Sequence, residues 1–444
     1  MSPAHADTTN GRAPLWNRGF LSLLATQFFE AASDNVLKTL LSFAVAEGGP
    51  WAGRLGEGGQ GWVGFAFTAP FIVLSAFGGR MADRLSKSST TVGLKLASVV
   101  VAGIAITAFH ADSVSTALVA VVAFAVVSSF FGPVKYGMIA ELVDRSQIGR
   151  ANGIVNMATN LAVIIGIIVG GQVAMRFRLA HGGAGGFGFW LPGLTMLAFV
   201  LGGLLTALTL PRLAPQKPGL PLDPNPFSTY WQALRGMAEG PLLVVALAWT
   251  FFYFLAATVL LVIPDYTTLL GIDEEESSYL SAVMAVTIGV GCIAAAWISG
   301  DRLRPRLVPF GAAGLALFFL LLGLGPRSPW TVGALLGGMG LVAGFYIIPL
   351  QSMLQALAPD GERGRFLGTA NAMSFVMGGV GSLLFVGVKR AGLASDRSFL
   401  ILAALAALVG GLLAWWLHAR REQLDRATLP APAPSAGGES QGTP

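Results

Sequence analysis

Long apolar runs alternate with short segments rich in glycine, proline or charge along almost the whole chain. A transmembrane helix needs about 20 mostly apolar residues to cross the bilayer core, and short polar punctuation between such runs is typical of a helical bundle. The pattern predicts twelve membrane spans, at about 19–46, 60–79, 91–110, 114–140, 149–175, 187–210, 241–264, 277–299, 307–325, 330–356, 366–389 and 398–418. We therefore expect an all-α polytopic membrane protein.

One connection differs from the others in length and composition. The segment 211–240 is rich in proline, which interrupts a continuous helix, and it is longer than every other predicted connection. It divides the predicted spans into six and six. The expected organisation is a cytoplasmic tail at 1–18, a six-helix bundle at 19–210, a cytoplasmic central loop at 211–240, a second six-helix bundle at 241–418 and a disordered cytoplasmic tail at 419–444.

Two short motifs recur in the two halves at nearly the same offset. The segment 79–85 corresponds to 297–303, each after the second span of its half, and 149–156 corresponds to 364–371, each opening the fifth span. The repetition indicates a duplicated six-helix unit. Parallel repeats of this kind are a transporter architecture, with the substrate site near the membrane midplane between the halves. The predicted fold is two pseudo-symmetric six-helix bundles.

Composition and charge exclude several other classes. The chain is 54% hydrophobic and 11% charged, against roughly 25% charged in an average soluble domain, so we do not expect a soluble enzyme. The net charge of +5 suits the basic cytoplasmic loops of a membrane protein better than a nucleic-acid partner. One cysteine, Cys292, and four histidines favour neither a disulfide framework nor a metal site. We expect no cofactor and no metal.

Basic residues near the predicted span ends indicate the orientation. Nineteen Lys and Arg residues fall on the side of the N-terminus and seven on the other, which places both termini in the cytoplasm under the positive-inside rule. The polar segment 1–18 lacks the apolar core of a cleavable signal. We expect a monomeric, multi-pass protein of the bacterial inner membrane.

Ionisable side chains inside the predicted spans are few. Glu30, Asp34 and Lys38 follow at steps of four on the first span, hence on one helical face, with Asn35 beside them. Lys135 on the fourth span is expected within reach of Glu30 and, marginally, of Asp34. An ionisable group in hydrocarbon costs at least about 2.5 to 3.5 kcal/mol, so these groups should face the bundle interior. We predict a site for substrate binding or coupling; the alternative is a static ion pair between the two helices.

Charged residues at the cytoplasmic ends of the spans are predicted to act in gating. The charged ones are Asp83 and Arg84, their counterparts Asp301 and Arg302, and Glu141 with Arg150; Gly79 is predicted to act with Asp83 and Arg84. Glu141 and Arg150 are expected to form a lock across the loop between the fourth and fifth spans. Lys95, near another inner end, is expected to extend its side chain to the membrane surface. The glycine-rich stretches 166–171 and 337–344 are interpreted as helix-packing seams.

The segments 79–84 and 132–142 carry a resemblance to a known family. GlyxxxAspArg at 79–84, followed by Lys87, resembles the loop signature of the major facilitator superfamily. GlyProValLysTyrGly at 132–137, with a weaker match at 27–35, resembles the lysophospholipid transporters within it. The resemblance implies flipping of lysophospholipids, chiefly lysophosphatidylethanolamine and lysophosphatidylglycerol, from the outer to the inner leaflet for reacylation by a separate acyltransferase. It implies that Asp34 and Lys135 are the functional acid and base, and it adds Tyr136 to the predicted binding site.

The predicted function is secondary transport of an amphipathic substrate, with two halves rocking around a midplane cavity. The first half would line the cavity with the polar residues above. The second half would supply an aromatic wall made of Phe251, Phe252, Tyr253, Phe345 and Tyr346. Two alternatives remain open: a proton-coupled exporter of hydrophobic cations, in which Glu30 or Asp34 cycles protons, and a receptor or scaffold that binds without translocation. The coupling cation, proton or sodium, is left open as well.

Overall fold

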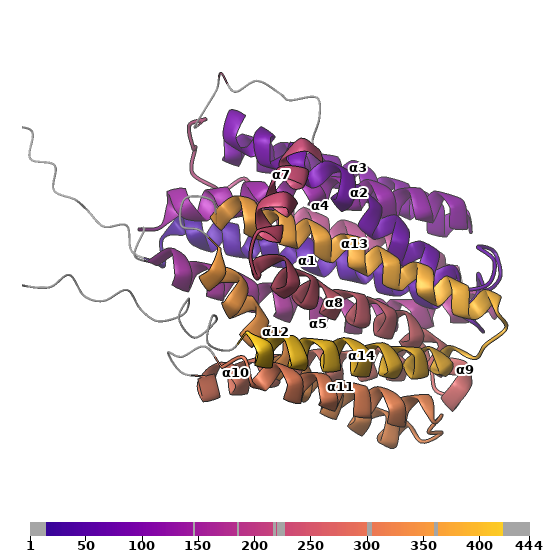
Figure 1. Cartoon of the computed structure of the whole chain (residues 1–444). Coiled ribbons are helices and arrows are strands. Elements are labelled where there is room, and N and C mark those ends of the chain that lie inside the picture. The colour runs from indigo at the N-terminus through magenta and orange to yellow at the C-terminus, as the bar shows by residue number, and fades with distance from the viewer. Residues whose placement is uncertain are drawn as a thin grey trace, which may run out of the picture.

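A computed structural model describes residues 15–144, 147–183, 186–215, 219, 227–299, 304–358 and 363–420. Over these residues the chain is helical and has no strand, which confirms the all-α prediction. The first half contains α1 (Arg18–Val45), α2 (Gly59–Arg84), α3 (Lys87–His110), α4 (Val114–Leu142), α5 (Ile148–His181) and α6 (Phe187–Ala207). The second half contains α8 (Leu242–Val262), α10 (Glu274–Ser299), α11 (Leu307–Gly323), α12 (Pro329–Leu357), α13 (Arg363–Arg390) and α14 (Ser398–Ala419). These helices lie side by side along one axis (Figure 1).

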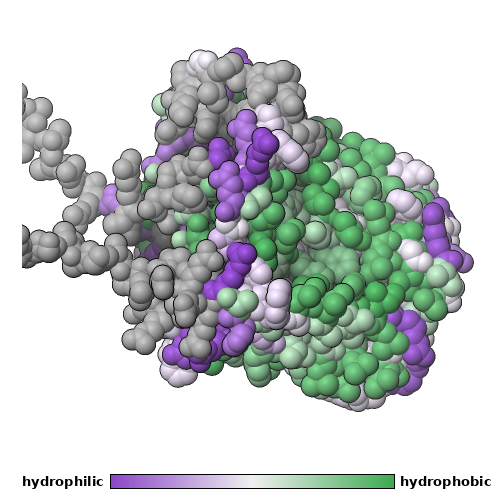
Figure 2. All heavy atoms as spheres, in the orientation of Figure 1, coloured by the Kyte–Doolittle hydropathy of each residue, from purple (hydrophilic) through white to green (hydrophobic). Residues whose placement is uncertain are grey.

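The long helices suit a membrane. Among the described residues, nine helices are long and apolar enough to cross one, and a tenth apolar helix, α11, has 17 residues. Helix α1 is not among the nine because Glu30, Asp34 and Lys38 interrupt its apolar sequence. Figure 2 shows a broad apolar surface between hydrophilic residues at both ends. The helix positions agree with the predicted spans, and their number is consistent with twelve.

The proline-rich connection contains a short helix that the sequence analysis did not predict, α7 (Phe227–Ala238). The prolines of this segment all lie before Phe227, so the twelve residues that follow are free to form a helix. Helix α7 packs against α8 and α13. Ala233 and Met237, one turn apart, are buried, whereas Trp231 is exposed. The connection is therefore not irregular throughout.

Buried hydrophobic residues form separate clusters in the two halves. One cluster lies within residues 233–417, and three others lie within 15–210. Between the halves, α2 packs against α13 and α5 packs against α10. Short helices complete the second half: η2 (Ile263–Asp265), α9 (Tyr266–Leu270) and η3 (Ser395–Arg397). Each half thus has its own core, and these two helix pairs make most of the contact between the halves in the part of the chain that the structure describes.

Both glycine-rich stretches lie at close helix contacts, which confirms that they are packing seams. A Cβ added to Gly166 on α5 would lie 2.6 Å from the carbonyl oxygen of Ala32 on α1. On α12, a Cβ added to Gly344 would overlap the backbone of Gly291 on α10. Because only glycine lacks a Cβ, it lets two helix backbones approach this closely.

The bundle has two ends that are useful to distinguish. Helix α1 begins and α14 ends at the same end, the left of Figure 1, which we call the terminal end. The opposite end, which we call the distal end, carries the connections from α1 to α2, from α3 to α4 and from α13 to α14. Polar groups gather at the distal end and in the interior of the first half, and these are described next.

Candidate functional site

A pair of carboxyl groups lies in the interior of the first half. Glu30 and Asp34, one turn apart on α1, are both buried. The Oγ atom of Ser128 on α4 lies 3.0 Å from Oε1 of Glu30 and 2.8 Å from Oδ2 of Asp34. The other oxygen of Glu30, Oε2, forms an ion pair with Lys95 of α3. We call Glu30, Asp34, Lys95 and Ser128 the carboxyl cluster; it joins three helices.

The prediction that Lys95 extends to the membrane surface is wrong. Its side chain is only 1% exposed, and its ammonium group lies 4.2 Å from the centroid of the Phe131 ring. Lys95 is eight residues into α3 and Glu30 twelve residues into α1, about 12 and 18 Å from the terminal end. A charge at that depth is stabilised when an opposite charge lies near it. The sequence signal for this pair was two opposite charges within apolar runs, Glu30 in the first predicted span and Lys95 in the third.

The expected pairing of Lys135 with Glu30 or Asp34 does not form, because Lys95 is the partner of Glu30. Lys135 is buried, and its ammonium group lies 4.7 Å from the ring centroid of Tyr136. The ammonium group of Lys38 lies 5.3 Å from the ring centroid of Phe67 on α2. Within the part of the chain that the structure describes, neither lysine has a carboxylate in ion-pair contact. Each of the two ammonium groups lies over an aromatic ring instead.

Two further predicted site residues lie apart from the carboxyl cluster. Asn35 donates its amide hydrogen to the carbonyl oxygen of Ala31 at 2.8 Å, and its Cβ lies where α1 meets Gly166 of α5. Tyr136 is 50% exposed, and its ring centroid lies 4.7 Å from the ammonium group of Lys135. Asn35 thus lies at a helix contact, whereas Tyr136 lies beside Lys135.

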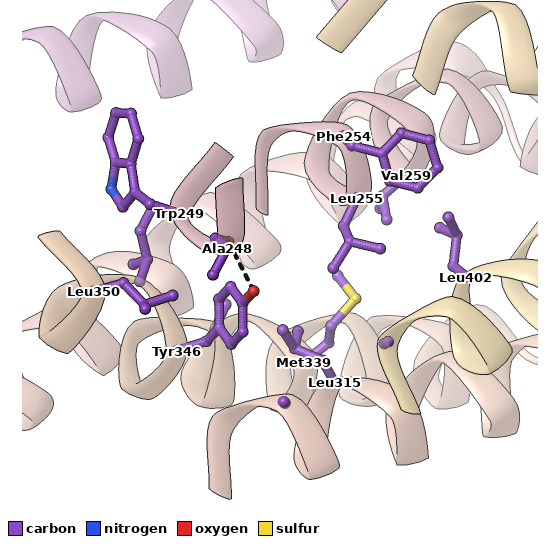
Figure 3. Close-up of a cluster of buried hydrophobic side chains, with 14 of the residues drawn as sticks. Ala248, Trp249, Phe254, Leu255, Val259, Leu315, Met339, Tyr346, Leu350 and Leu402 are labelled. Carbon is purple, nitrogen blue, oxygen red and sulfur yellow. Dashed lines mark hydrogen bonds between the residues drawn. The ribbon is translucent and has the colours of Figure 1, made fainter. Parts of the chain in front are cut away.

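The predicted aromatic wall is only partly where it was expected. Tyr346 is wrong as a wall residue, because it is buried in the core of the second half and donates to the carbonyl oxygen of Ala248 at 2.8 Å (Figure 3). Phe345 packs edge-on against Phe310 of α11, with ring centroids 5.6 Å apart. The aromatic side chains of α8 that are partly buried are Phe251, Phe252 and Tyr253. These three side chains pack against the buried core of the second half.

The predicted gating residues have different partners or lie outside the described residues. Glu141 forms an ion pair with Lys87 at 2.5 Å rather than with Arg150, which is exposed; the predicted lock between Glu141 and Arg150 is wrong for this conformation. The reason is that Lys87 begins α3 next to the end of α4.

Arg84 is exposed at the end of α2. Gly79 and Asp83 belong to α2, but their side-chain surroundings are not described; Asp301 and Arg302 lie outside the described residues.

A buried acidic group at the distal end joins the two halves and was not predicted. Oδ1 of Asp265 accepts hydrogen bonds from the Gln60 amide at 2.5 Å and from the backbone N–H of Glu47 at 3.3 Å. Oδ2 accepts from the Ser395 hydroxyl and lies 3.5 Å from Nζ of Lys389. Lys389 also pairs with the Glu47 carboxylate at 3.1 Å. Gln60 and Glu47 belong to the first half and the other three residues to the second.

A second contact at the distal end links α5 to α10. Arg178 pairs with Glu274 at 2.5 Å, and Gln172 donates to Glu275 at 3.4 Å. Together with the contacts of Asp265, this contact joins both interface helix pairs at the same end of the bundle. The signal in the sequence was a set of acidic residues at the ends of apolar runs: Asp265 directly follows one run, and Glu274 and Glu275 stand just before another. Their partners could not be recognised, because they lie more than 90 residues away along the chain.

Asp112, in the connection from α3 to α4, organises the distal surface of the first half. Its carboxylate accepts from Arg54 at 2.7 Å and from the Trp51 indole N–H, and it lies 2.8 Å from Nε2 of His181. Burial acts to raise the pKa of Asp112, but the hydrogen bonds from Arg54, Trp51 and His181 outweigh it and hold that pKa below its usual value. The ionised carboxylate therefore ties two loops and the end of α5 together.

We expect acidification to destabilise the protein, because the Asp112 carboxylate becomes protonated. A carboxyl group with a lowered pKa in the folded state stabilises the fold above its unfolded pKa of about 3.9, and this contribution is lost as the pH falls through the folded pKa. Between about pH 5 and pH 3, the melting temperature of the wild-type protein in detergent should therefore fall more steeply than that of Asp112→Asn. Glu57→Gln, an exposed carboxylate in the loop before α2, is the control. Parallel curves for all three proteins would contradict the prediction.

Comparisons with known proteins agree with this architecture. The family model of the Major Facilitator Superfamily matches residues 23–382. The chain is 28% identical over 371 residues to the lysophospholipid transporter LplT of Yersinia pestis (strain Pestoides F). The aligned residues make up 81% of this chain and 83% of that protein. LplT of Yersinia pseudotuberculosis serotype O:3 (strain YPIII) matches to the same extent.

Solved transporter structures share the fold. A bacterial homologue of the human lysosomal transporter Spinster, inward-facing and unoccupied, aligns with a TM-score of 0.68 at 15% identity over 95% of this chain and 100% of that one. The POT family transporter PepTSo aligns with a TM-score of 0.68 at 16% identity over 92% and 99% of the two chains. The motif at 79–84 predicted the same family from the sequence. The chain belongs to the major facilitator superfamily.

Proposed function

We propose that the protein transports a lysophospholipid from the outer to the inner leaflet by alternating access of its two halves. The observation that carries the proposal is Lys135, a buried lysine with no carboxylate in contact among the described residues, next to the half-exposed Tyr136. A buried cation calls for a counter-charge, and a lipid phosphate supplies one with strong acceptor oxygens. The relatives named as lysophospholipid transporters support this choice of substrate.

The surroundings of Lys135 suit an amphipathic substrate. In this proposal the headgroup binds on the side of the carboxyl cluster, and the acyl chain lies toward the partly buried aromatic side chains of α8. Tyr253 packs against Trp249, with ring centroids 4.9 Å apart, and against Phe252 at 5.7 Å. A phosphate headgroup would contact Lys135 while a single acyl chain lies along the aromatic surface. A second acyl chain would need additional apolar surface at the same place.

The contacts at the distal end support alternation between two conformations. Under the positive-inside rule the terminal end is cytoplasmic, so Asp265 and Arg178 hold the halves together on the outer side. We take this conformation to be closed toward the outside. Loading from the outer leaflet would require the hydrogen bonds of Asp265 to break, and release would deliver the lipid to an acyltransferase at the inner leaflet.

Replacing Lys135 by alanine is expected to reduce lipid uptake at least tenfold. A hydrogen bond to a charged group contributes about 1.5 to 3 kcal/mol, and 1.4 kcal/mol corresponds to a factor of about ten. The reduction is measured as uptake of lysophosphatidylethanolamine and lysophosphatidylglycerol into proteoliposomes. Asp34→Asn tests the predicted functional acid in the same assay. Arg306→Ala, which removes an exposed arginine before α11, is the matched control.

Three outcomes in proteoliposomes would overturn the proposal. Full lipid uptake in both Lys135→Ala and Asp34→Asn would show that neither residue serves transport. Efflux of a cationic dye by the wild-type protein, without any lipid uptake, would instead support a drug exporter. Binding of lysophospholipid without translocation would support a receptor or scaffold.

A further inference from the structure

Ser128 contacts two carboxyl groups but has one hydrogen to donate. Its Oγ atom lies within hydrogen-bond distance of Glu30 Oε1, at 3.0 Å, and of Asp34 Oδ2, at 2.8 Å. A serine hydroxyl donates a single hydrogen, and an ionised carboxylate only accepts. If both carboxyl groups were ionised, one of the two contacts would bring lone pairs together without a hydrogen between them. The arrangement therefore needs one proton more than Ser128 supplies.

The extra proton belongs on one of the two acids, and their surroundings differ. Glu30 has an ammonium group, that of Lys95, in contact with its second oxygen, which favours the ionised form. The second oxygen of Asp34, Oδ1, is buried and has no hydrogen-bond partner within the described residues. A buried charged oxygen without a partner is costly, whereas a neutral carboxylic acid tolerates such a position better.

The other charged groups around Asp34 do not alter this assignment. On its own helix, Lys38 lies over the ring of Phe67. On α4, Lys135 lies over Tyr136. The charged residues of α5 lie near its ends, and α6 has none, so these two neighbours of α1 bring no charge to the level of Asp34. Lys95 on α3 contacts Glu30.

We propose that Asp34 is a proton-binding site and is protonated in this conformation. The Asp34 carboxyl donates its hydrogen to Ser128, and Ser128 donates its own hydrogen to the Glu30 carboxylate, which Lys95 neutralises. When the site opens to water, the proton passes from Asp34 to solvent, and the Asp34 carboxylate becomes a partner for Lys38 or for a cationic headgroup. That the proton couples transport to a gradient rests on the proposed function; the bound proton itself does not.

Infrared spectroscopy of the full-length protein in proteoliposomes tests the assignment, because a carboxylic acid and a carboxylate absorb at separate frequencies. At pH 7 the difference spectrum of the wild-type protein minus Asp34→Asn should contain a carboxylic acid band that shifts in D2O. The corresponding Glu30→Gln difference should lack that band. Ser128→Ala should shift the Asp34 band to higher frequency, because the acid loses its acceptor. Ser129→Ala is the matched control: its hydroxyl donates to the Val126 carbonyl oxygen at 2.7 Å, and the band should not move.

A second measurement uses the wild-type protein and avoids any variant that fails to fold. Incorporation of aspartate labelled with carbon-13 at the side-chain carboxyl should shift the band if an aspartic acid carries the proton. Labelled glutamate should leave it in place. The proposal is overturned if no carboxylic acid band depends on Asp34, or if the band follows glutamate labelling and is lost in Glu30→Gln. Neither measurement involves lipid transport, so a negative uptake assay would not affect the result.

Discussion

Replacing Lys95 by methionine should destabilise the protein by about 3 to 5 kcal/mol, the cost of leaving one member of a buried ion pair without its partner. The Lys95 side chain is 1% exposed and that of Glu30 is 6% exposed, so water cannot replace the lost contact. Methionine keeps much of the packing against Phe131, which isolates the effect of the charge. Unfolding in detergent, followed by tryptophan fluorescence, measures the loss.

A double-mutant cycle separates the ion pair from its surroundings. Glu30→Gln alone should also destabilise the protein, because it leaves the Lys95 ammonium group buried without a counter-charge. The double variant Glu30→Gln/Lys95→Met should recover most of the loss, since no unpaired charge remains. Lys38→Met, whose ammonium group has no carboxylate in contact within the described residues, should cost less than Lys95→Met. Simple additivity of the two single changes would contradict a direct ion pair.

Replacing Gly344 by valine should prevent the second half from folding normally. A Cβ at this position would overlap the backbone of Gly291 and the amide nitrogen of Cys292 on α10. Overpacking costs about 1 to 3 kcal/mol where side chains can move, and occasionally more. Here the obstacle is helix backbone, so α10 and α12 would have to separate. We expect a large fall in the yield of monodisperse protein, measured by size-exclusion chromatography.

The control for this prediction lies on α10 itself. A Cβ added to Gly289 would have no heavy atom within 4 Å. Gly289→Ala should therefore leave yield unchanged, or stabilise the helix by about 0.5 to 1 kcal/mol through the lower entropy of its unfolded chain. A Gly344→Val protein as stable as Gly289→Ala would show that the two helices are not in close contact at this point.

The helices and the family were predictable from the sequence because both depend on local patterns. Whether a segment is long and apolar enough to span a membrane depends on about 20 consecutive residues. The resemblance depends on short motifs at 79–84 and 132–142. Helix α7 was missed because the prolines before it dominated the local pattern, although they end one residue before the helix begins.

The partners within the site were not predictable in the same way. Glu30, Asp34 and Lys135 were identified because charge is rare within the spans, but Lys95 was assigned to the membrane surface. Its true partner depends on how α3 lies against α1, which is a matter of helix packing and depth. Ser128 carried no signal at all, since a serine in an apolar helix is common and its role depends on two carboxyl groups about 95 residues away.

The sequence by itself predicted which segments are long and apolar enough to cross a membrane, indicated two related halves, and identified which ionisable groups need compensation inside the bundle. Hydrophobic length and the cost of buried charge are properties of single segments, and they can be read along the chain. Only the tertiary structure decided that Glu30 pairs with Lys95, that Ser128 bridges Glu30 and Asp34, and that Asp265 holds the distal ends of the halves together. These contacts join residues 65 to 218 positions apart, and the packing of separate helices alone determines which of the available partners meet.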